Sequence, residues 1–332
     1  MRFRGGGEKL RAELASQLPV ASRKKMWSSF RIRRYMEMAK SKSRWGRLIF
    51  KLAVYVLLID MSFVFLYPFI YMISTSLKTP VDLLDMSIRW IPRSMEVKNY
   101  AIAYKLLSYP LYLKNSAILS IVPMAGQVIS CSFVGYGFAR FKFPGREVLF
   151  MLAMFTLIIP PQSLIIPLFI QYKALGWMDT YLPIIVPSFL GAGLRGALFI
   201  FIFRQFFRGL PYELEEAAII DGCSSFRIYW NIIMPVSQPA ILVTSILSLV
   251  WHWNDYFEPT VYLNSFEKFT LPMMLPRLYQ QLEQLAIGRT GEELSITVVM
   301  AATFLVVLPM LILYLILQKQ FMKGIERSGI VG

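Results

Sequence analysis

The sequence is poor in the residues that build metal sites and disulfide frameworks. It contains one histidine and two cysteines in 332 residues. A single histidine cannot supply a two-histidine metal site. Cys131 falls in an apolar run and Cys223 in a polar stretch, so we expect no disulfide between them. These shortages argue against a disulfide scaffold and a histidine-based metal centre.

Recognisable catalytic motifs are also missing. The chain has no G-x-x-x-x-G-K-[ST] phosphate-binding loop, so it lacks an ATPase site of its own. Ser224 and Ser225 have no nearby base in the sequence, and we interpret them as helix caps. We nominate no catalytic, cofactor-binding or metal-binding residue and predict that the chain is not an enzyme.

Charged residues are scarce, at 17% of the chain, whereas apolar residues reach 56%. A soluble domain of this length could not bury so much apolar surface, so lipid must cover it. The formal charge of +15 could suggest nucleic acid, which requires a basic face on a folded soluble domain. Much of the excess instead precedes residue 48. We predict a membrane protein that binds no nucleic acid.

Six segments are long and apolar enough to span a bilayer. Each is close to the ~20 residues that a hydrocarbon core of ~30 Å requires, and such segments must be helical. They are residues 48–73, 115–138, 148–170, 182–203, 239–257 and 296–317. Prolines inside them predict bent helices, and glycines predict close helix contacts. The sequence therefore predicts an all-α membrane protein with a six-helix transmembrane domain over residues 48–317.

Lysine and arginine in the connections orient these spans. With both termini on one side, that side would hold 23 of the 35 Lys and Arg residues, against nine on the other. Basic residues favour the cytoplasmic face. We therefore predict a multi-pass protein of the cell membrane with both termini in the cytoplasm, where residues 318–332 form a tail. Residues 74–113 and 258–295 would lie outside.

Residues 1–47 form a basic amino-terminal segment. Within it Ile32, Tyr35, Met36 and Ala39 recur with helical spacing among basic residues. This pattern is typical of an amphipathic helix on the inner membrane surface. The alternative is a disordered basic tail with the same effect on topology.

The most informative stretch is the cytoplasmic loop at residues 209–235. Pro211 suits the first turn of a helix. Asp221 and Gly222 can end that helix, because glycine readily adopts the left-handed cap conformation. The first turn of this helix would hold three negatively charged residues, which the positive amino-terminal end of the helix dipole stabilises. They are Glu213, Glu215 and Glu216.

A second short helix is expected directly after this one. Ser224 or Ser225 can cap it, and Pro235 would stop it. On the first helix Ala217 and Ala218 would leave one face without bulk, so that another protein could approach closely. The loop thus predicts two short helices that transmit force and perform no chemistry.

The pattern of this loop resembles the signature loop of bacterial binding-protein-dependent ABC importer permeases. It runs Glu216-Ala217-Ala218, then Gly222, then Ile232 and Met234-Pro235. The family usually has leucine where this chain has Met234. In the family the loop is the coupling helix, which docks into a cleft on the ATPase subunit. The resemblance implies an ATPase-coupling role for Glu216, Ala217, Ala218, Asp221, Gly222 and Pro235.

Other segments resemble the carbohydrate branch of this family, as represented by the smaller permease of maltose transporters. They are residues 74–78, Asn99-Tyr100, residues 204–207, Trp253-Asn254-Asp255 and the tail from Lys323 to Gly332. The resemblance implies the type I ABC importer permease fold and an oligosaccharide substrate in a bacterial cell membrane. The implied partners are a second permease, two ATPase subunits that bind ATP and Mg, an extracytoplasmic binding protein and membrane lipid.

Arg195 lies near the middle of the fourth span. A charge there costs at least ~2.5–3.5 kcal/mol on insertion scales, so it should face protein or water. One interpretation places Arg195 on the transport path, where its guanidinium would bind hydroxyl or carboxylate groups of a sugar. The other has it satisfying backbone carbonyls that prolines leave free.

The outer end of the fifth span combines aromatic and hydrogen-bonding side chains. Sugars use both kinds of group, because ring C–H faces lie on aromatics and hydroxyls need polar partners. The alternative is an interfacial aromatic belt, which occurs in many membrane proteins. The candidate pathway residues at this end are Trp251, Trp253, Asn254, Asp255 and Tyr256.

Three other functions remain open. A permease of the same family could carry a solute other than a sugar. An ion-coupled secondary transporter would need inverted repeats and embedded carboxylates, of which the chain shows little. A membrane-bound enzyme or scaffold has no site residues to nominate.

Overall fold

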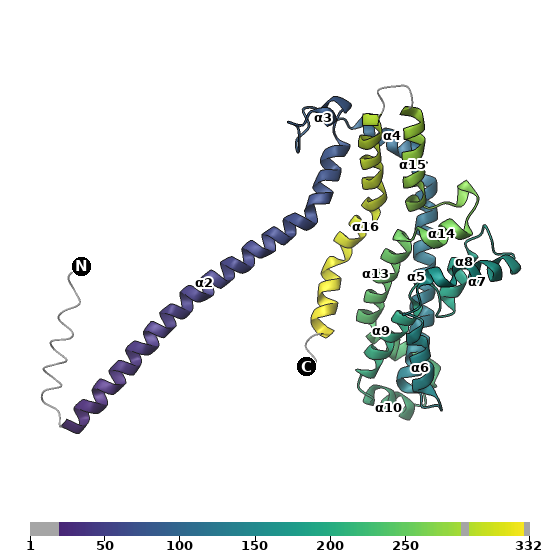
Figure 1. The fold of residues 1–332 in the computed structure, drawn as a ribbon. Helices are drawn as coiled ribbons and strands as arrows, with labels where there is room; N and C mark the ends of the chain where they lie inside the picture. The colour runs from purple at the N-terminus through teal and green to yellow at the C-terminus, as the bar shows by residue number, and fades with distance from the viewer. Residues whose placement is uncertain (1–19, 287–291, 329–332) are drawn as a thin grey trace. The chain divides into compact units, whose positions relative to one another are not determined.

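The computed structural model describes residues 20–286 and 292–328, and every regular element in those ranges is helical. The elements through the first half are α2 (Val20–Ser76), α3 (Pro80–Leu84), α4 (Lys98–Leu106), α5 (Tyr109–Arg140), α6 (Arg146–Phe155), α7 (Pro161–Ala174) and α8 (Leu182–Phe189). The second half holds α9 (Gly196–Arg208), α10 (Glu213–Ile220), α11 (Ser225–Ile228), η1 (Tyr229–Ile233), α12 (Met234–Val236), α13 (Gln238–Asn254), α14 (Phe257–Tyr262), η2 (Phe266–Lys268), α15 (Leu271–Ala286) and α16 (Glu292–Ser328). Figure 1 shows them along the chain.

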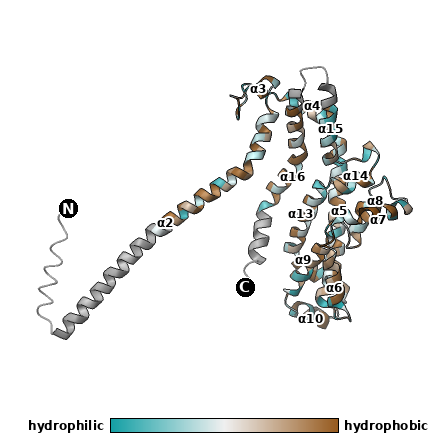
Figure 2. Cartoon of the chain, in the orientation of Figure 1, coloured by the Kyte–Doolittle hydropathy of each residue, from teal (hydrophilic) through white to brown (hydrophobic). Residues whose placement is uncertain are grey.

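The chain divides into two units, Met1–Ile70 and Tyr71–Gly332. Most of α2 belongs to the first unit. The positions expected to form an amphipathic surface helix, 32–39, lie within this helix, and their side chains are outside the described residues. From Leu48 onward α2 is strongly apolar, as Figure 2 shows, and its side chains as far as Ile70 are exposed. Hydrocarbon is the solvent that suits such a surface.

Three helices of the described chain are long and apolar enough to cross a membrane: Leu48–Ser76, Tyr109–Arg140 and Ile296–Gln318. A fourth candidate is a bent pair, in which Ser225–Val236 meets Gln238–Asn254 at 77°. These four match the first, second, sixth and fifth predicted segments. The straight part of the bent pair is α13, so the short helices before it run almost perpendicular to the spanning direction.

The third and fourth predicted segments are each divided into two helices. The third is divided into α6 and α7 before Pro161, and the fourth into α8 and α9 by residues 190–195. Pro160-Pro161 removes two backbone donors from the first break. At the second break Gly191 and Gly193 adopt positive φ angles of 73° and 78°, which glycine tolerates without strain.

Helix α5 is the element against which the second unit packs, because α8, α9 and α13 all contact it. Gly135 permits one of these close approaches. A Cβ atom built on it would lie 2.8 Å from Cβ of Phe203 on α9. Gly126 lies equally close to the ring of Phe189 on α8. The predicted role of small residues in helix contact is confirmed at both glycines, whereas a Cβ atom at Gly137 would meet nothing within 4 Å.

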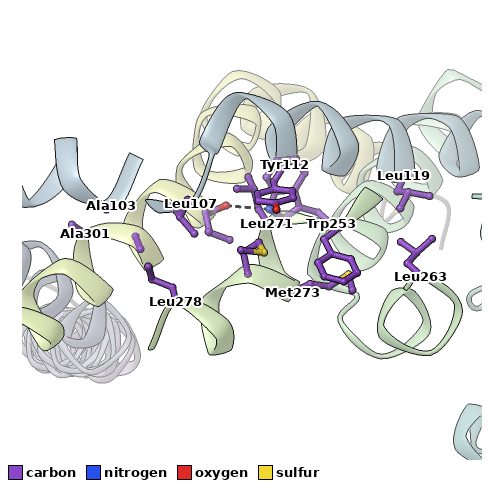
Figure 3. Close-up of a cluster of buried hydrophobic side chains, with 14 of the residues drawn as sticks. Ala103, Leu107, Tyr112, Leu119, Trp253, Leu263, Leu271, Met273, Leu278 and Ala301 are labelled. Atoms are coloured by element: carbon purple, nitrogen blue, oxygen red, sulfur yellow. Dashed lines mark hydrogen bonds between the residues drawn. The ribbon is translucent and has the colours of Figure 1, made fainter. Parts of the chain in front are cut away.

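Two buried apolar clusters hold the second unit together. One joins the start of α5 to α4, α15 and α16, and Figure 3 shows part of it, including Tyr112, Leu107 and Leu271. The other joins the end of α5 to α9, α10 and the helices after it through residues such as Phe203 and Tyr229. The second cluster supports the loop at residues 209–235.

Two sequence segments that suggested the carbohydrate branch meet in space. The amide of Asn99 donates to the carbonyl oxygens of Ser76 and Lys78 at 2.9 and 3.0 Å. The hydroxyl groups of Ser76 and Tyr100 lie 2.7 Å apart. These contacts fix the turn that follows α2, so both segments have a structural role.

Candidate functional site

The loop at residues 209–235 folds as the sequence predicts over its first half. Helix α10 carries its three glutamates in the first turn, where the positive end of the helix dipole favours them. It ends at Asp221, and Gly222 follows with a φ of 79°. The backbone N–H of Cys223 then donates to the carbonyl of Ala218 at 2.9 Å, which closes the turn.

The second helix of the loop starts as expected and ends differently. Ser224 caps α11 by accepting a hydrogen bond from the backbone of Arg227. The predicted stop at Pro235 is wrong, because Pro235 lies inside α12, which ends at Val236. The 77° bend into α13 follows at Ser237, whose buried hydroxyl donates to the carbonyl of Ile233.

The two short helices carry exposed acidic and apolar side chains, and we call this set of residues the docking face. Glu216 and Ala217 are exposed on α10, whereas Ala218 is buried among the residues of its own chain, with 4% of its area exposed. Ile220 is 85% exposed. The remaining large apolar members of the docking face are Tyr212, Leu214, Ile219 and Phe226.

A buried arginine of α5 binds this loop through several contacts. Arg140, the last residue of α5, places its Nε 2.7 Å from a carboxylate oxygen of Glu215, and only 2% of its side chain is exposed. Its Nη2 donates to the carbonyl of Leu210 at 2.8 Å, and its guanidinium lies 4.1 Å from the ring centre of Tyr212. Tyr136 donates to the other oxygen of Glu215 at 3.2 Å. The sequence reasoning missed this group, because the partners are far apart in the chain.

A second arginine stabilises the neighbouring helices without touching α10. Arg204 of α9 lies 2.7 Å from Glu147, and its guanidinium lies 3.9 Å from the ring centre of Phe150. This contact ties α6 to α9. The segment at residues 204–207, which suggested the carbohydrate branch, therefore contributes a structural contact.

The predicted pathway residue Arg195 lies at the break between α8 and α9. It is exposed and adopts a φ of 58°, an uncommon conformation for a residue other than glycine. Its guanidinium lies 4.7 Å from the ring centre of Trp251 on α13. The structure thus brings two of the predicted pathway residues together. The carbonyl of the preceding residue, Leu194, accepts a 2.8 Å hydrogen bond from Gln127 of α5.

The other predicted pathway residues have varied surroundings. Trp253 is buried and donates to the carbonyl of Val306 on α16, a contact that joins these two helices. Asp255 accepts hydrogen bonds from two backbone N–H groups and thereby caps α14. Asn254 and Tyr256 are exposed, and Asn254 donates to the carbonyl of Val250.

Comparison with known proteins identifies the family. The model of the family described as "Binding-protein-dependent transport system inner membrane component" matches residues 132–327. A putative ABC transporter permease protein of a Caldicellulosiruptor strain is 32% identical over 90% of this chain and 100% of its own length.

Two further similarities concern sugar transport proteins and the fold. The probable starch degradation products transport system permease protein AmyC of Thermoanaerobacterium thermosulfurigenes is 29% identical over 82% of this chain and 94% of its own. A solved bacterial ABC transporter, described as involved in the import of the acidic polysaccharide alginate, contains a chain with a TM-score of 0.71 at 24% identity. The match covers 82% of this chain and 96% of that one, and it shows a shared fold.

The family match covers more than half of the chain and therefore confirms the resemblance found in the loop at residues 209–235. The all-α permease fold is confirmed as well. The chain belongs to the family of inner membrane components of binding-protein-dependent transport systems, the permease subunits of ABC importers.

Proposed function

We propose that this permease subunit forms half of the translocation path of an ATP-driven oligosaccharide importer. A second permease would supply the other half, and two ATPase subunits and an extracytoplasmic binding protein would complete the complex. The observation that carries the proposal is the docking face, where the family's Glu216-Ala217 pair lies exposed on a short helix backed by a buried ion pair. Relatives named for starch degradation products and arabinooligosaccharides support the substrate class.

The mechanism follows from the shape of the loop. ATP, bound with Mg by the partner ATPase subunits, closes their dimer and moves the docking face. Because α10 is attached to the end of α5, its movement shifts the helices packed on α5, and the path opens outward to receive sugar from the binding protein. Hydrolysis reverses the movement. The chain itself carries no P-loop motif, so the hydrolysis belongs to the partner.

The proposal includes the orientation of the chain in the membrane. Lys and Arg residues are concentrated in the segments that share a side with residues 204–237. Basic residues remain on the cytoplasmic side of the membrane. Both termini and the docking face would therefore lie in the cytoplasm, within reach of ATPase subunits.

An acidic oligosaccharide fits the predicted pathway best. Arg195 is exposed beside Trp251, and the described residues provide it with no carboxylate partner. A guanidinium binds a sugar carboxylate through two parallel hydrogen bonds, while an indole supports the apolar face of the ring. One relative is named for polygalacturonan and rhamnogalacturonan transport. Calorimetry of the binding protein with neutral and acidic glycans tests this substrate class, and binding of neutral glycans alone would contradict it.

The coupling role is tested in proteoliposomes that contain all partners. Sugar with binding protein should stimulate ATP hydrolysis in the wild type. Replacement of Glu216 by Lys or of Gly222 by Ala should remove the stimulation, because the first reverses a charge on the docking face and the second disfavours its positive φ. Wild-type rates in both variants would refute the role. Uptake that survives ATP depletion and collapses with an ion gradient would favour a secondary transporter.

A further inference from the structure

The contacts of Arg140 attach α10 to α5, and this attachment bears on function as well as on the stability of the fold. In α10, Ala218 is the one buried residue. Packing of its own side chains alone would attach α10 only weakly to the spanning helices. Polar contacts to side chains of α5, chiefly that of Arg140, provide further attachment.

Arg140 makes these contacts at three points along the loop. The points are the carbonyl of Leu210, the ring of Tyr212 and the carboxylate of Glu215. They lie before the start of α10 and within its first turn. A planar guanidinium with several donors can hold three such groups at once, whereas an ammonium group offers only a point charge.

The Glu215 carboxylate is itself held from a second position on α5. Its other oxygen accepts a hydrogen bond from Tyr136, one helical turn before Arg140. Two residues on one face of α5 therefore fix one carboxylate of α10. An exposed ion pair would exchange freely with water, but here 2% of the Arg140 side chain and 13% of the Glu215 side chain are exposed. At such low exposure water screens the attraction between the two charges less than it would at the surface.

Helix α5 connects the Arg140–Glu215 contact to the predicted pathway. The same helix carries Gln127, which donates to the carbonyl of Leu194 next to Arg195. It also packs along α9 and α13, the helices that carry or follow the pathway residues. A displacement of α10 therefore has a continuous route through α5 to the break between α8 and α9.

We propose that Arg140, with Glu215 as its partner, is the positioning residue that transmits movement of the docking face to the transmembrane helices. This inference rests on the proposed coupling function. Arg140 lies behind the docking face, so it need not touch the ATPase subunit. Its loss should separate ATP hydrolysis from transport and leave the assembled complex intact.

The test uses the complete complex in proteoliposomes with three variants, Arg140→Gln, Arg140→Lys and Glu215→Gln. Each keeps the approximate volume of the side chain and removes a charge or the planar fork. We expect ATPase subunits to co-purify with all three variants. The ratio of sugar-stimulated to basal ATP hydrolysis should fall about five- to 150-fold in the Gln variants, the range of typical coupling between sites. Arg140→Lys should lie between these variants and the wild type.

Arg204→Gln is the matched control for lost stability. Arg204 has similar burial, an ion pair of the same length and a neighbouring aromatic ring, but it holds Glu147 rather than α10. The stimulation ratio should remain near the wild-type value in Arg204→Gln even where its melting temperature falls as far as that of Arg140→Gln. Equal loss of the ratio in both variants would overturn the proposal, because the effect would then be one of general stability.

The Glu216→Lys variant separates this inference from the proposed function. If Glu216→Lys removes stimulation while the Arg140 and Glu215 variants retain it, the docking face couples but Arg140 is not the connection. If none of these variants changes stimulation, the coupling function itself fails. If Arg140→Gln does not assemble, Arg140→Lys and Glu215→Gln decide the question with the same ratio.

Discussion

The hydroxyl group of Ser248 donates a 2.6 Å hydrogen bond to the amide oxygen of Gln127, and both residues are fully buried. Gln127 in turn donates to the carbonyl of Leu194. One side chain of α5 thus joins α13 to the break between α8 and α9, directly beside Arg195. Buried polar networks of this kind fix relative positions when each member has a partner.

Replacement of Gln127 by Leu should weaken the contacts that fix the segment between α8 and α9. It leaves the Leu194 carbonyl and the Ser248 hydroxyl without this partner, at a cost of about 1–3 kcal/mol for each unsatisfied group. We expect the KM for sugar uptake to rise, with ATPase subunits still bound, because the change lies near the predicted pathway. Gln205→Leu, at an exposed position of α9, is the control. An unchanged KM and melting temperature in Gln127→Leu would contradict the positioning role.

Gly135 and Gly137 form a matched pair on α5. Alanine at Gly135 would bring a methyl group within 2.8 Å of Phe203 Cβ, while alanine at Gly137 meets nothing within 4 Å. Gly135→Ala should destabilise the α5–α9 contact by about 1–3 kcal/mol, as overpacking typically does. Gly137→Ala should be neutral or stabilise by about 0.5–1 kcal/mol through helix propensity. Melting curves of the purified subunit test the pair, and the reverse order of stabilities would refute it.

The sequence predicts the parts of this protein that depend on local chemistry. The helix–turn–helix at Gly222 and the Ser224 cap follow from residue preferences at helix ends. Helix α5 follows from a long apolar run. The break after residue 155 was signalled by Pro160-Pro161, but a hydropathy pattern cannot distinguish a bent helix from two separate ones.

What the sequence could not reveal depends on contacts between distant segments. Arg140 and Glu215 are far apart in the sequence, and only the fold brings Nε of Arg140 to 2.7 Å from a carboxylate oxygen of Glu215. Gln127 lies in a long apolar segment, and its partners Leu194 and Ser248 are distant in the sequence. Trp253 belongs to the aromatic and polar group that predicts the pathway, and the sequence does not reveal its hydrogen bond to Val306 on α16. The pattern of an aromatic cluster does not show which side of a helix is buried.

Asp179 should make its contacts with residues 264–268 sensitive to acid. Hydrogen bonds from the side chain and backbone of Ser265, together with Lys268 and the backbone of Asn264, hold the pKa of Asp179 well below its usual range. A carboxyl group with a lowered folded pKa stabilises the protein above its unfolded pKa of about 3.9, and that contribution is lost as the pH falls toward the folded pKa.

Asp179→Asn tests this contribution. Asn also tolerates the φ of 56° at this position, so the variant removes the charge without new strain. The difference in melting temperature between wild type and Asp179→Asn should be complete at pH 7 and should shrink below about pH 4, where the carboxyl of the unfolded wild-type chain begins to protonate. A difference that stays constant or grows down to pH 3 would contradict the assignment.

Ala217 and Ala218 should respond in opposite ways to added bulk. Leucine at buried Ala218 overpacks its own chain and should cost about 1–3 kcal/mol of subunit stability. Leucine at exposed Ala217 should leave the melting temperature of the isolated subunit unchanged and reduce co-purification of ATPase subunits. Measuring both properties in both variants separates the docking face from the packing behind it. Loss of ATPase binding without loss of stability in Ala218→Leu would contradict this division.

Site-specific photo-crosslinking tests the central claim most directly. A benzoylphenylalanine is placed at Ile220, 85% exposed on the docking face, and in a separate variant at Met86, 91% exposed in the loop predicted to lie outside. In membranes that contain the whole complex, Ile220 should crosslink to an ATPase subunit, and Met86 should not. Absence of an ATPase crosslink from Ile220, or capture of the extracytoplasmic binding protein at that position, would contradict the account.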